Sequence, residues 1–324
     1  MMWSRFARMI GLVSVFLVAA CGEGDEAAQA EKADQAAPPA IKLALVMKTL
    51  TNPFFVTMEK GARRAEAEFG IELQVKTAAE ETSIHQQIDI VNQLVRDGEV
   101  KAIIIAPGDS VQLIPALKAA QDAGIKVVNI DNQLDQNVSK NYGLTDVPFI
   151  SVDNAAAAYL SAKYIADRMT GPTKAAILEG IPTAANAKAR KAGAERAFEE
   201  SPNISIVAST PANWKIDEAY AVTSQIFEEN PDIGAIFSSN DMMAMGVLKY
   251  LEENRLDTVL VAGFDAIEEA KSAIQQGKLA VTIDQLPAEQ GYAGVKMALD
   301  LINGKPAPSE IMIDVQVVDQ AALQ

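Results

Sequence analysis

Short apolar runs alternate with amphipathic stretches along most of the chain. The first set of runs lies at 43–47, 72–76, 102–106 and 126–130, with helical patterns that begin near Phe54, Ser83 and Val111. The second set lies at 174–178, 205–209, 235–238 and 259–262, with helical patterns that begin near Thr183, Lys215, Asp241 and Ala266. Such alternation is typical of βαβ units, which build parallel sheets. Two sets in 324 residues predict an α/β protein with two doubly wound parallel-sheet domains.

The loop after the first apolar run carries an amide and two aromatic rings. Pro53 suits the first position of a helix, and Asn52 before it is a natural N-cap. Phe54 and Phe55 therefore lie in the first helical turn. Two adjacent rings cannot both face the core side of one helix, so at least one should line a cleft, where its apolar face could stack on the C–H face of a sugar ring. A hydrophobic staple at the helix start is the alternative interpretation.

The N-terminal segment has the parts of an export signal. Arg5 and Arg8 precede an apolar stretch, 10–20, which is too short to span a bilayer as a stable helix. Cys21, the only cysteine in 324 residues, follows directly. The five residues that end at Cys21 resemble a bacterial lipoprotein box, in which the cysteine is lipid-modified. We therefore predict a signal peptide with a lipobox over 1–21; a plain secretory signal with an incidental thiol is the alternative.

Composition excludes several kinds of chemistry. Residues 22–40 are rich in Ala, Glu, Asp and Gln and predict a flexible tether. The body after the tether has no cysteine, and His85 is its only histidine, which argues against disulfides, thiolate or His-rich metal sites and Ser-His-Asp catalysis. His85 is expected to be a solvated or capping residue. The formal charge of -15 argues against a nucleic-acid partner. We expect no metal and no cofactor.

The run Leu43 to Met47 and the loop Asn52-Pro53-Phe54-Phe55 resemble the ribose-type periplasmic sugar-binding proteins of ABC importers. Similar segments recur in order at 106–110, 129–133, 237–241, 263–265 and 282–287. The resemblance implies the type I periplasmic binding protein fold, with two domains joined by a three-strand hinge.

The same resemblance implies where the chain passes between the domains. The crossings are expected near 151–154, near 285–287 and near Asp314. The N-terminal lobe would then contain 41–151 and 286–314, and the C-terminal lobe 152–285 and 315–324.

A buried sugar needs amides and charged groups for its hydroxyls and aromatic rings for its faces. Carried over onto this sequence, and with the polar residues of the same loops added, the family pattern implies the following ligand-binding residues: Lys48, Asn52, Phe54, Phe55, Asp131, Asn132, Lys188, Arg190, Trp214, Asn240, Phe264, Asp265 and Gln285. Trp214 stands where the family often has another aromatic residue. Asp131 could instead be a helix or turn cap.

Several positions depart from the ribose-type pattern. That pattern has serine at Lys48, asparagine at Ala106, arginine at Asn132, and arginine at Lys188 or, by a looser alignment, at Arg190. Replacing bidentate arginine forks changes which hydroxyls can be held, so the ligand is expected to differ from ribose. A ketohexose, a polyol or an acidic sugar are all open. Lys48 either reaches the ligand or snorkels to water at the cleft rim.

The sequence as a whole predicts a binding protein and not an enzyme. We expect a monomeric, exported cell-envelope lipoprotein that binds a small sugar, polyol or sugar acid and delivers it to an ABC transporter permease, held at the membrane only by its lipid anchor. A sugar sensor that presents its closed form to a chemoreceptor or histidine kinase is the alternative. An enzyme would have to use Asp131 and Asp265 as acid and base, and the chain has no phosphate-binding glycine loop or nucleophile elbow.

Overall fold

The computed structural model describes residues 40–324, which form one compact unit. The predicted signal peptide, the lipobox with Cys21 and almost all of the predicted tether lie outside the described residues. No helix between residues 40 and 324 has the length and hydropathy needed to cross a bilayer.

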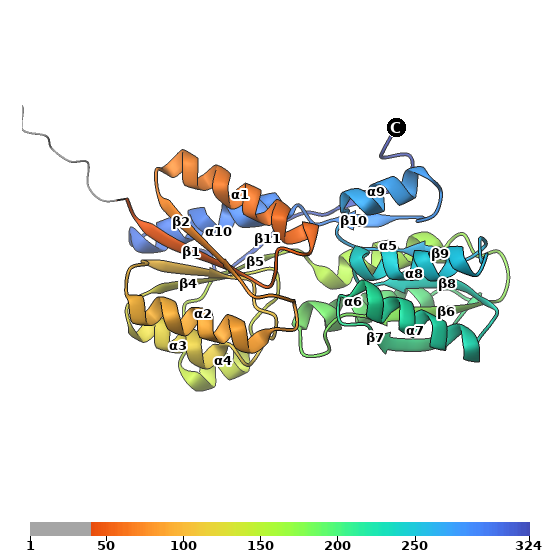
Figure 1. Cartoon of the computed structure of the whole chain (residues 1–324), viewed down its shortest axis with the longest axis horizontal. Coiled ribbons are helices and arrows are strands. Elements are labelled where there is room, and N and C mark those ends of the chain that lie inside the picture. The colour runs from red at the N-terminus through yellow and green to blue at the C-terminus, as the bar shows by residue number, and fades with distance from the viewer. Residues whose placement is uncertain (1–39) are drawn as a thin grey trace, which may run out of the picture. The chain divides into compact units, whose positions relative to one another are not determined.

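The N-terminal lobe is built on a six-stranded parallel sheet with the order β11-β5-β4-β3-β1-β2. Its strands are β1 (Lys42–Met47), β2 (Glu72–Thr77), β3 (Ala102–Ile105), β4 (Lys126–Ile130), β5 (Phe149–Ser151) and β11 (Glu310–Met312). Its helices are α1 (Pro53–Phe69), α2 (Ile84–Asp97), α3 (Ile114–Asp122), α4 (Gln136–Tyr142) and α10 (Pro287–Ile302). Helices α1 and α10 cover one face of the sheet, and α2, α3 and α4 lie on the other (Figure 1).

The C-terminal lobe repeats this arrangement on a four-stranded parallel sheet with the order β7-β6-β8-β9. Its strands are β6 (Thr173–Glu179), β7 (Ile204–Pro211), β8 (Ile233–Ser238) and β9 (Leu260–Ala262), extended by the antiparallel pair β10 (Thr282–Asp284) and β12 (Gln316–Val318). Its helices are α5 (Asn154–Ala166), α6 (Ala185–Glu199), α7 (Ile216–Glu229), α8 (Asp241–Glu253) and α9 (Glu268–Gln275). Helices α5 and α6 pack on one face, and α7, α8 and α9 pack on the other.

The chain passes between the two sheets three times. It leaves the N-terminal sheet after β5, returns between β10 and α10, and leaves again between β11 and β12. These three segments lie side by side and form the only chain connections between the lobes within residues 40–324. A hinge of three segments bends more readily than it twists, which suits closure of the lobes over a ligand.

The fold predicted from the sequence is confirmed. The apolar runs are buried on both faces, as in Leu43 to Met47, which explains why they are continuous instead of alternating. The pattern of apolar runs did not mark α4, α5 or α10. Phe69, on the last turn of α1, is 36% exposed and packs against Tyr292.

Candidate functional site

Loops at the carboxyl ends of the strands enclose a small cavity between the lobes. The residues that line it are Lys48, Asn52, Phe54, Phe55, Glu81, Asp131, Asn186, Arg190, Trp214, Asn240, Asp265 and Gln285. The first six come from the N-terminal lobe and the others from the C-terminal lobe and the β10–α10 hinge segment. This is the edge at which open α/β sheets bind ligands.

The aromatic wall of the cavity comes from the start of α1. Asn52 caps this helix by accepting a hydrogen bond from the Phe54 amide at 3.0 Å, and Pro53 occupies the first helical position, as the sequence predicts. Phe54 and Phe55 meet edge to face, with ring centroids 5.0 Å apart. Both rings line the cavity and both also pack into the core below it, so the premise that two adjacent rings cannot share the core side of the helix is wrong. One helical turn thus serves the core and the site together.

A buried charge cluster forms the N-terminal side. Lys48 is 2% exposed, and its Nζ lies 2.8 Å from Asp131 Oδ2 and 4.0 Å from Glu81 Oε2. Asn52 Nδ2 donates to Glu81 Oε1 at 2.9 Å. Burial raises the pKa of Glu81, while the Lys48 charge and the Asn52 hydrogen bond oppose this shift. The idea that Lys48 snorkels to water is wrong, because two buried carboxylates hold its ammonium inside.

The C-terminal side is organised around Arg190. Its Nε donates to Asn154 Oδ1 at 2.8 Å, and one Nη donates to the Ser239 carbonyl oxygen at 2.9 Å. The guanidinium also lies 3.5 Å from Asp265 Oδ1 and 3.8 Å from the centroid of the Phe264 ring. Burial raises the pKa of Asp265 well above its ordinary value, and the Arg190 charge opposes this shift. Arg190 is therefore fixed on every side except the one toward the cavity.

Asp241 positions the loop that carries Asp265. Its two carboxylate oxygens accept hydrogen bonds from the amides of Phe264 and Ile267, at 2.9 and 3.1 Å, and from the hydroxyl of Thr282. Burial raises the pKa of Asp241 to about 6. Because this carboxylate ties β8, β9 and β10 together, the loop keeps Asp265 at φ 126°, a conformation that side chains rarely adopt.

Direct contacts hold the two lobes together around the cavity. Ser110 Oγ accepts from the Ala185 amide at 2.9 Å, and Asn132 Oδ1 accepts from the Asn186 amide at 3.2 Å. At the outer rim, Lys215 Nζ pairs with Glu80 at 2.9 Å. These contacts join loops of opposite lobes, so the structure is that of a closed cleft.

The cavity collects buried polar side-chain atoms that make no hydrogen bond within the protein. Among residues 40–324, five buried side-chain nitrogen or oxygen atoms lack a hydrogen bond. Four of them lie on cavity-lining residues: Asp131 Oδ2, Asn186 Oδ1, Trp214 Nε1 and Gln285 Oε1. The Lys48 ammonium forms an ion pair with Asp131 Oδ2, but the two groups do not have hydrogen-bond geometry. Because an unpaired buried polar atom costs about 1 to 3 kcal/mol, this concentration indicates groups that await a polar ligand.

Three of the thirteen predicted site residues do not line the cavity. Lys188 is exposed, because it lies two residues before Arg190 on α6 and so points to a different side of the helix. Asn132 is engaged by the Pro107 carbonyl oxygen and the Asn186 amide. Phe264 is fully buried beneath Arg190 and supports it.

The sequence missed two lining residues, Glu81 and Asn186. Glu81 lies in the loop after β2, a strand whose half-buried pattern gave no reason to single out that loop. Asn186 is the second residue of α6, and the family pattern marks only the charged residues Lys188 and Arg190 on this helix. The signal available for both is their place in, or just beyond, the loop at the carboxyl end of a predicted strand.

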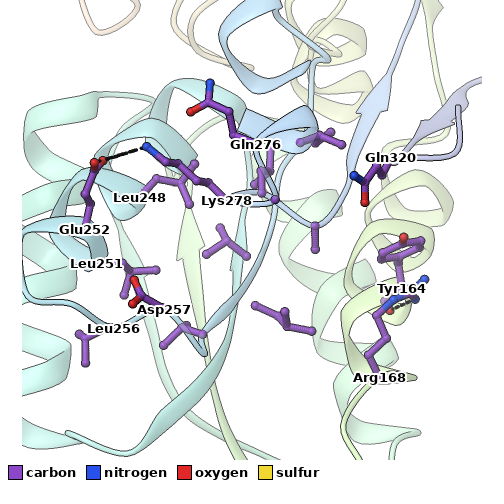
Figure 2. Close-up of a pocket in the computed structure, with 17 residues that line it drawn as sticks. Tyr164, Arg168, Leu248, Leu251, Glu252, Leu256, Asp257, Gln276, Lys278 and Gln320 are labelled. Carbon is purple, nitrogen blue, oxygen red and sulfur yellow. Dashed lines mark hydrogen bonds and ion pairs between the residues drawn. The ribbon is translucent and has the colours of Figure 1, made fainter. Parts of the chain in front are cut away.

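A second, larger hollow of about 520 Å³ lies at the amino end of β9 (Figure 2). Aliphatic side chains form its floor, and the Glu252–Lys278 ion pair closes one side, facing Tyr164 and Arg168 across the hollow. None of the five unpartnered atoms found in the described part of the chain belongs to it. Its position away from the carboxyl-end loops makes the interlobe cavity the stronger candidate site.

The family model for the periplasmic binding protein domain matches residues 43–306. The chain belongs to this family. It is 38% identical to the D-ribose/D-allose-binding protein of Pseudomonas aeruginosa. The alignment spans 278 residues and covers 84% of this chain and 86% of that one. The chain is 33% identical to the D-allose-binding periplasmic protein of Escherichia coli, over 86% of this chain and 91% of that one.

The fold comparison agrees. A periplasmic solute-binding protein of an ABC transporter from Actinobacillus succinogenes, solved with bound D-allose, superposes with a TM-score of 0.82 at 40% identity and covers 87% of this chain and 99% of that one. The predictions of a ribose-type sugar-binding protein of the ABC transporter class, and of a protein that is not an enzyme, are confirmed. Membership of this family also implies an exported, periplasmic protein.

Proposed function

We propose that this protein is an extracytoplasmic receptor that captures an uncharged aldose, with D-allose as the first candidate, in the interlobe cavity and delivers it to an ABC permease. The observation that carries the proposal is the group of four buried atoms on the cavity lining that make no hydrogen bond within the protein. Three of them are acceptors and one is a donor, which is the complement that a sugar with several hydroxyl groups can satisfy. Relatives that bind D-allose support this choice of sugar.

The charge of the lining favours a neutral ligand. Three carboxylates, Glu81, Asp131 and Asp265, line the cavity together with two cations, Lys48 and Arg190. Each cation already lies within 4 Å of a carboxylate. A sugar acid would add a further negative charge without a free cation to meet it, and burial of an unpaired charge is costly. Of the ligands that the sequence left open, this argument disfavours the acidic sugars.

Closure of the lobes would couple binding to delivery. We assign the N-terminal lobe to 41–151 and 286–314 and the C-terminal lobe to 152–285 and 315–324, so that each lobe supplies part of the lining. A ligand that contacts both lobes binds the closed form more tightly than the open one and shifts the population toward it. A permease that recognises the closed form would then receive loaded receptors. A chemoreceptor or kinase could recognise the same form, which is why the sensor remains the second candidate.

The proposal includes a lipid anchor at Cys21 and a tether over 22–40. The anchor would hold a monomeric receptor at the membrane surface near its permease, and the tether would let the two lobes turn toward it. The support for this part is the order of the charged, apolar and small residues before Cys21. Metabolic labelling with a fatty-acid analogue tests it: label on the wild-type chain and none on Cys21→Ala is expected, and equal label on both contradicts it.

A thermal-shift screen tests the ligand class. The protein is heated with pentoses, hexoses, polyols, inositols and sugar acids, each at a hundred times the expected dissociation constant. A bound ligand at that ratio adds about 2.7 kcal/mol to the free energy of unfolding, which raises the melting temperature measurably. We expect the largest shift with D-allose or a close neutral aldose and none with sugar acids. A panel in which only the sugar acids stabilise the protein contradicts the proposal.

A further inference from the structure

Helix α6 begins at the interface between the lobes without a side-chain cap of its own. Its N-cap residue, Ala184, has the extended backbone of a capping residue, with φ -87° and ψ 131°, but no side-chain oxygen. Ser110 Oγ, from the opposite lobe, accepts from the Ala185 amide at 2.9 Å. Asn132 Oδ1, also from that lobe, accepts from the Asn186 amide at 3.2 Å. We infer that Ser110 and Asn132 form a cross-lobe cap of α6, which favours the closed cleft and positions the side chains that α6 presents to the ligand.

The cross-lobe cap matters because the first amides of an α-helix have no carbonyl partner within the helix. Several helices of the described chain meet this need within their own lobe. Helices α1, α4, α5 and α8 each donate to the side chain of their N-cap residue, which is Asn52, Asp135, Asp153 and Asn240, respectively. In α6 the acceptors lie across the cleft, so its first two amides pass to water when the lobes separate. Closure therefore gains the difference between a side-chain cap and water, and this gain does not depend on the sugar.

Both acceptors are held in place by their own lobe. Asn132 Nδ2 donates to the Pro107 carbonyl oxygen at 3.0 Å, which leaves Oδ1 for the α6 amide. The Ser110 carbonyl oxygen accepts from the Asp135 amide at 2.8 Å, and its hydroxyl lies 3.4 Å from Asn132 Oδ1. Because these contacts do not cross the cleft, little side-chain freedom remains to be lost on closure. Neither side chain lines the cavity, so their effect on sugar binding passes through α6.

The capped end of α6 carries two groups of the site. Asn186 and Arg190 are four positions apart, lie on the same side of the helix and line the cavity. Asn186 Nδ2 lies 3.4 Å from Asp131 Oδ1, and its Oδ1 makes no hydrogen bond within the protein. The helix packs closely on α5, since a Cβ atom added at Gly193 would lie 2.1 Å from the Ala155 carbonyl oxygen. The cap therefore fixes where this lobe brings its amide and its cation when the cleft is shut. The inference rests on the proposed function, because it concerns the affinity of the same site.

Ser110→Ala and Asn132→Ala test the cap, with Ser83→Ala as the matched control. Ser83 is the N-cap residue of α2, and its side chain makes no capping hydrogen bond. Loss of a side-chain cap typically changes an equilibrium constant by about twofold to thirtyfold. In calorimetry with D-allose, we expect an affinity loss in this range for both cap variants and an unchanged affinity for Ser83→Ala.

Stopped-flow tryptophan fluorescence, which reports on Trp214 at the cavity, separates the cap from a direct ligand contact in the open form. The sugar enters before the cap forms, so both cap variants should release D-allose faster and bind it at the wild-type association rate. Affinities equal to wild type in both cap variants, or a loss that lies only in the association rate, overturn the inference.

Ala184→Ser distinguishes the cap from a general effect on stability. A serine hydroxyl at this N-cap position can accept from the first turn of α6 whether the cleft is open or shut. The sugar-free variant should therefore melt no lower than wild type and yet bind D-allose more weakly, because closure gains less. Equal or tighter binding in a variant of that stability contradicts the inference.

Ala184 is fully buried, and if the serine lowers the stability, Ser110→Ala and Asn132→Ala decide. Failure of wild type to bind any neutral sugar overturns the proposed function itself. Sugar binding that is equal in wild type and in both cap variants overturns only the cross-lobe cap.

Discussion

The Lys48 ammonium is expected to neutralise two buried carboxylates, so its removal should be costly. Lys48→Met keeps a chain of similar length and removes the charge. Asp131, 2% exposed, and Glu81, 9% exposed, would then lose the ammonium that contacts them both. Their mutual repulsion and their unpaired burial both disfavour the folded, closed form.

The distances set the size of the effect. At an effective dielectric constant of about 20, the attraction of Lys48 Nζ to Asp131 at 2.8 Å is about 6 kcal/mol, and its attraction to Glu81 at 4.0 Å is about 4 kcal/mol. Desolvation of the three groups cancels much of this sum. Loss of one partner of a buried pair typically costs about 3 to 5 kcal/mol, which is the loss of unfolding free energy we expect.

Urea denaturation of a double-mutant cycle measures the interaction. The four proteins are wild type, Lys48→Met, Asp131→Asn and the double variant, with Lys60→Met, which changes an exposed lysine of α1, as the matched control. The loss of unfolding free energy in the double variant should be at least about 2 kcal/mol smaller than the sum of the losses in the two single variants. Lys60→Met should stay within about 0.5 kcal/mol of wild type. Additive single changes, within about 0.5 kcal/mol, would refute the reasoning that the pair is a coupled buried unit.

Three further predictions follow from other parts of the site. Glu81→Gln keeps the hydrogen bond from Asn52 possible but replaces one carboxylate oxygen of the cavity with a donor, so calorimetry should give roughly tenfold weaker D-allose binding; unchanged affinity contradicts this. Burial raises the pKa of Asp241 from 3.8 to about 6, so the folded state binds the extra proton, and stability from this group is lost as the pH rises through 6. Between pH 7.5 and pH 5 the unfolding free energy of wild type should therefore gain about 1.4 kcal/mol relative to Asp241→Asn, and parallel pH profiles of the two proteins contradict the assignment. Lys215→Gln breaks a partly exposed pair with Glu80 and should weaken apparent affinity by no more than about threefold; a larger loss would contradict the small contribution expected of this rim pair.

Much of the fold could be predicted from the sequence because strands and their following loops leave local signals. Continuous apolar runs mark strands that are buried on both faces, and the pair Asn52-Pro53 marks a helix start. The approximate starts of α1, α2, α7 and α8 follow from such signals. Helices α5 and α10 were not marked because they follow the hinge crossings, where the order of runs is interrupted.

The polar partners in the site could not be predicted, because they depend on distances in space. Lys48 and Glu81 are 33 positions apart, and only the pairing of β1 with β2 brings the loops after these strands together. The choice between Lys188 and Arg190 depends on the phase of α6, and this helix is so rich in small and charged residues that its buried side is hard to recognise. The sequence marks Asp241 only as a helix start, because its role in holding the Asp265 loop depends on contacts with Ile267 and Thr282, which lie further along the chain.

Isothermal titration calorimetry with D-allose tests most directly the claim that both lobes hold one neutral sugar. The proteins are wild type and one variant from each lobe, Asp131→Ala and Asp265→Ala, with the folded state of each checked by circular dichroism. We predict one bound sugar per wild-type chain and no measurable binding to either folded variant. Wild-type affinity in either variant would contradict a site that the two lobes share.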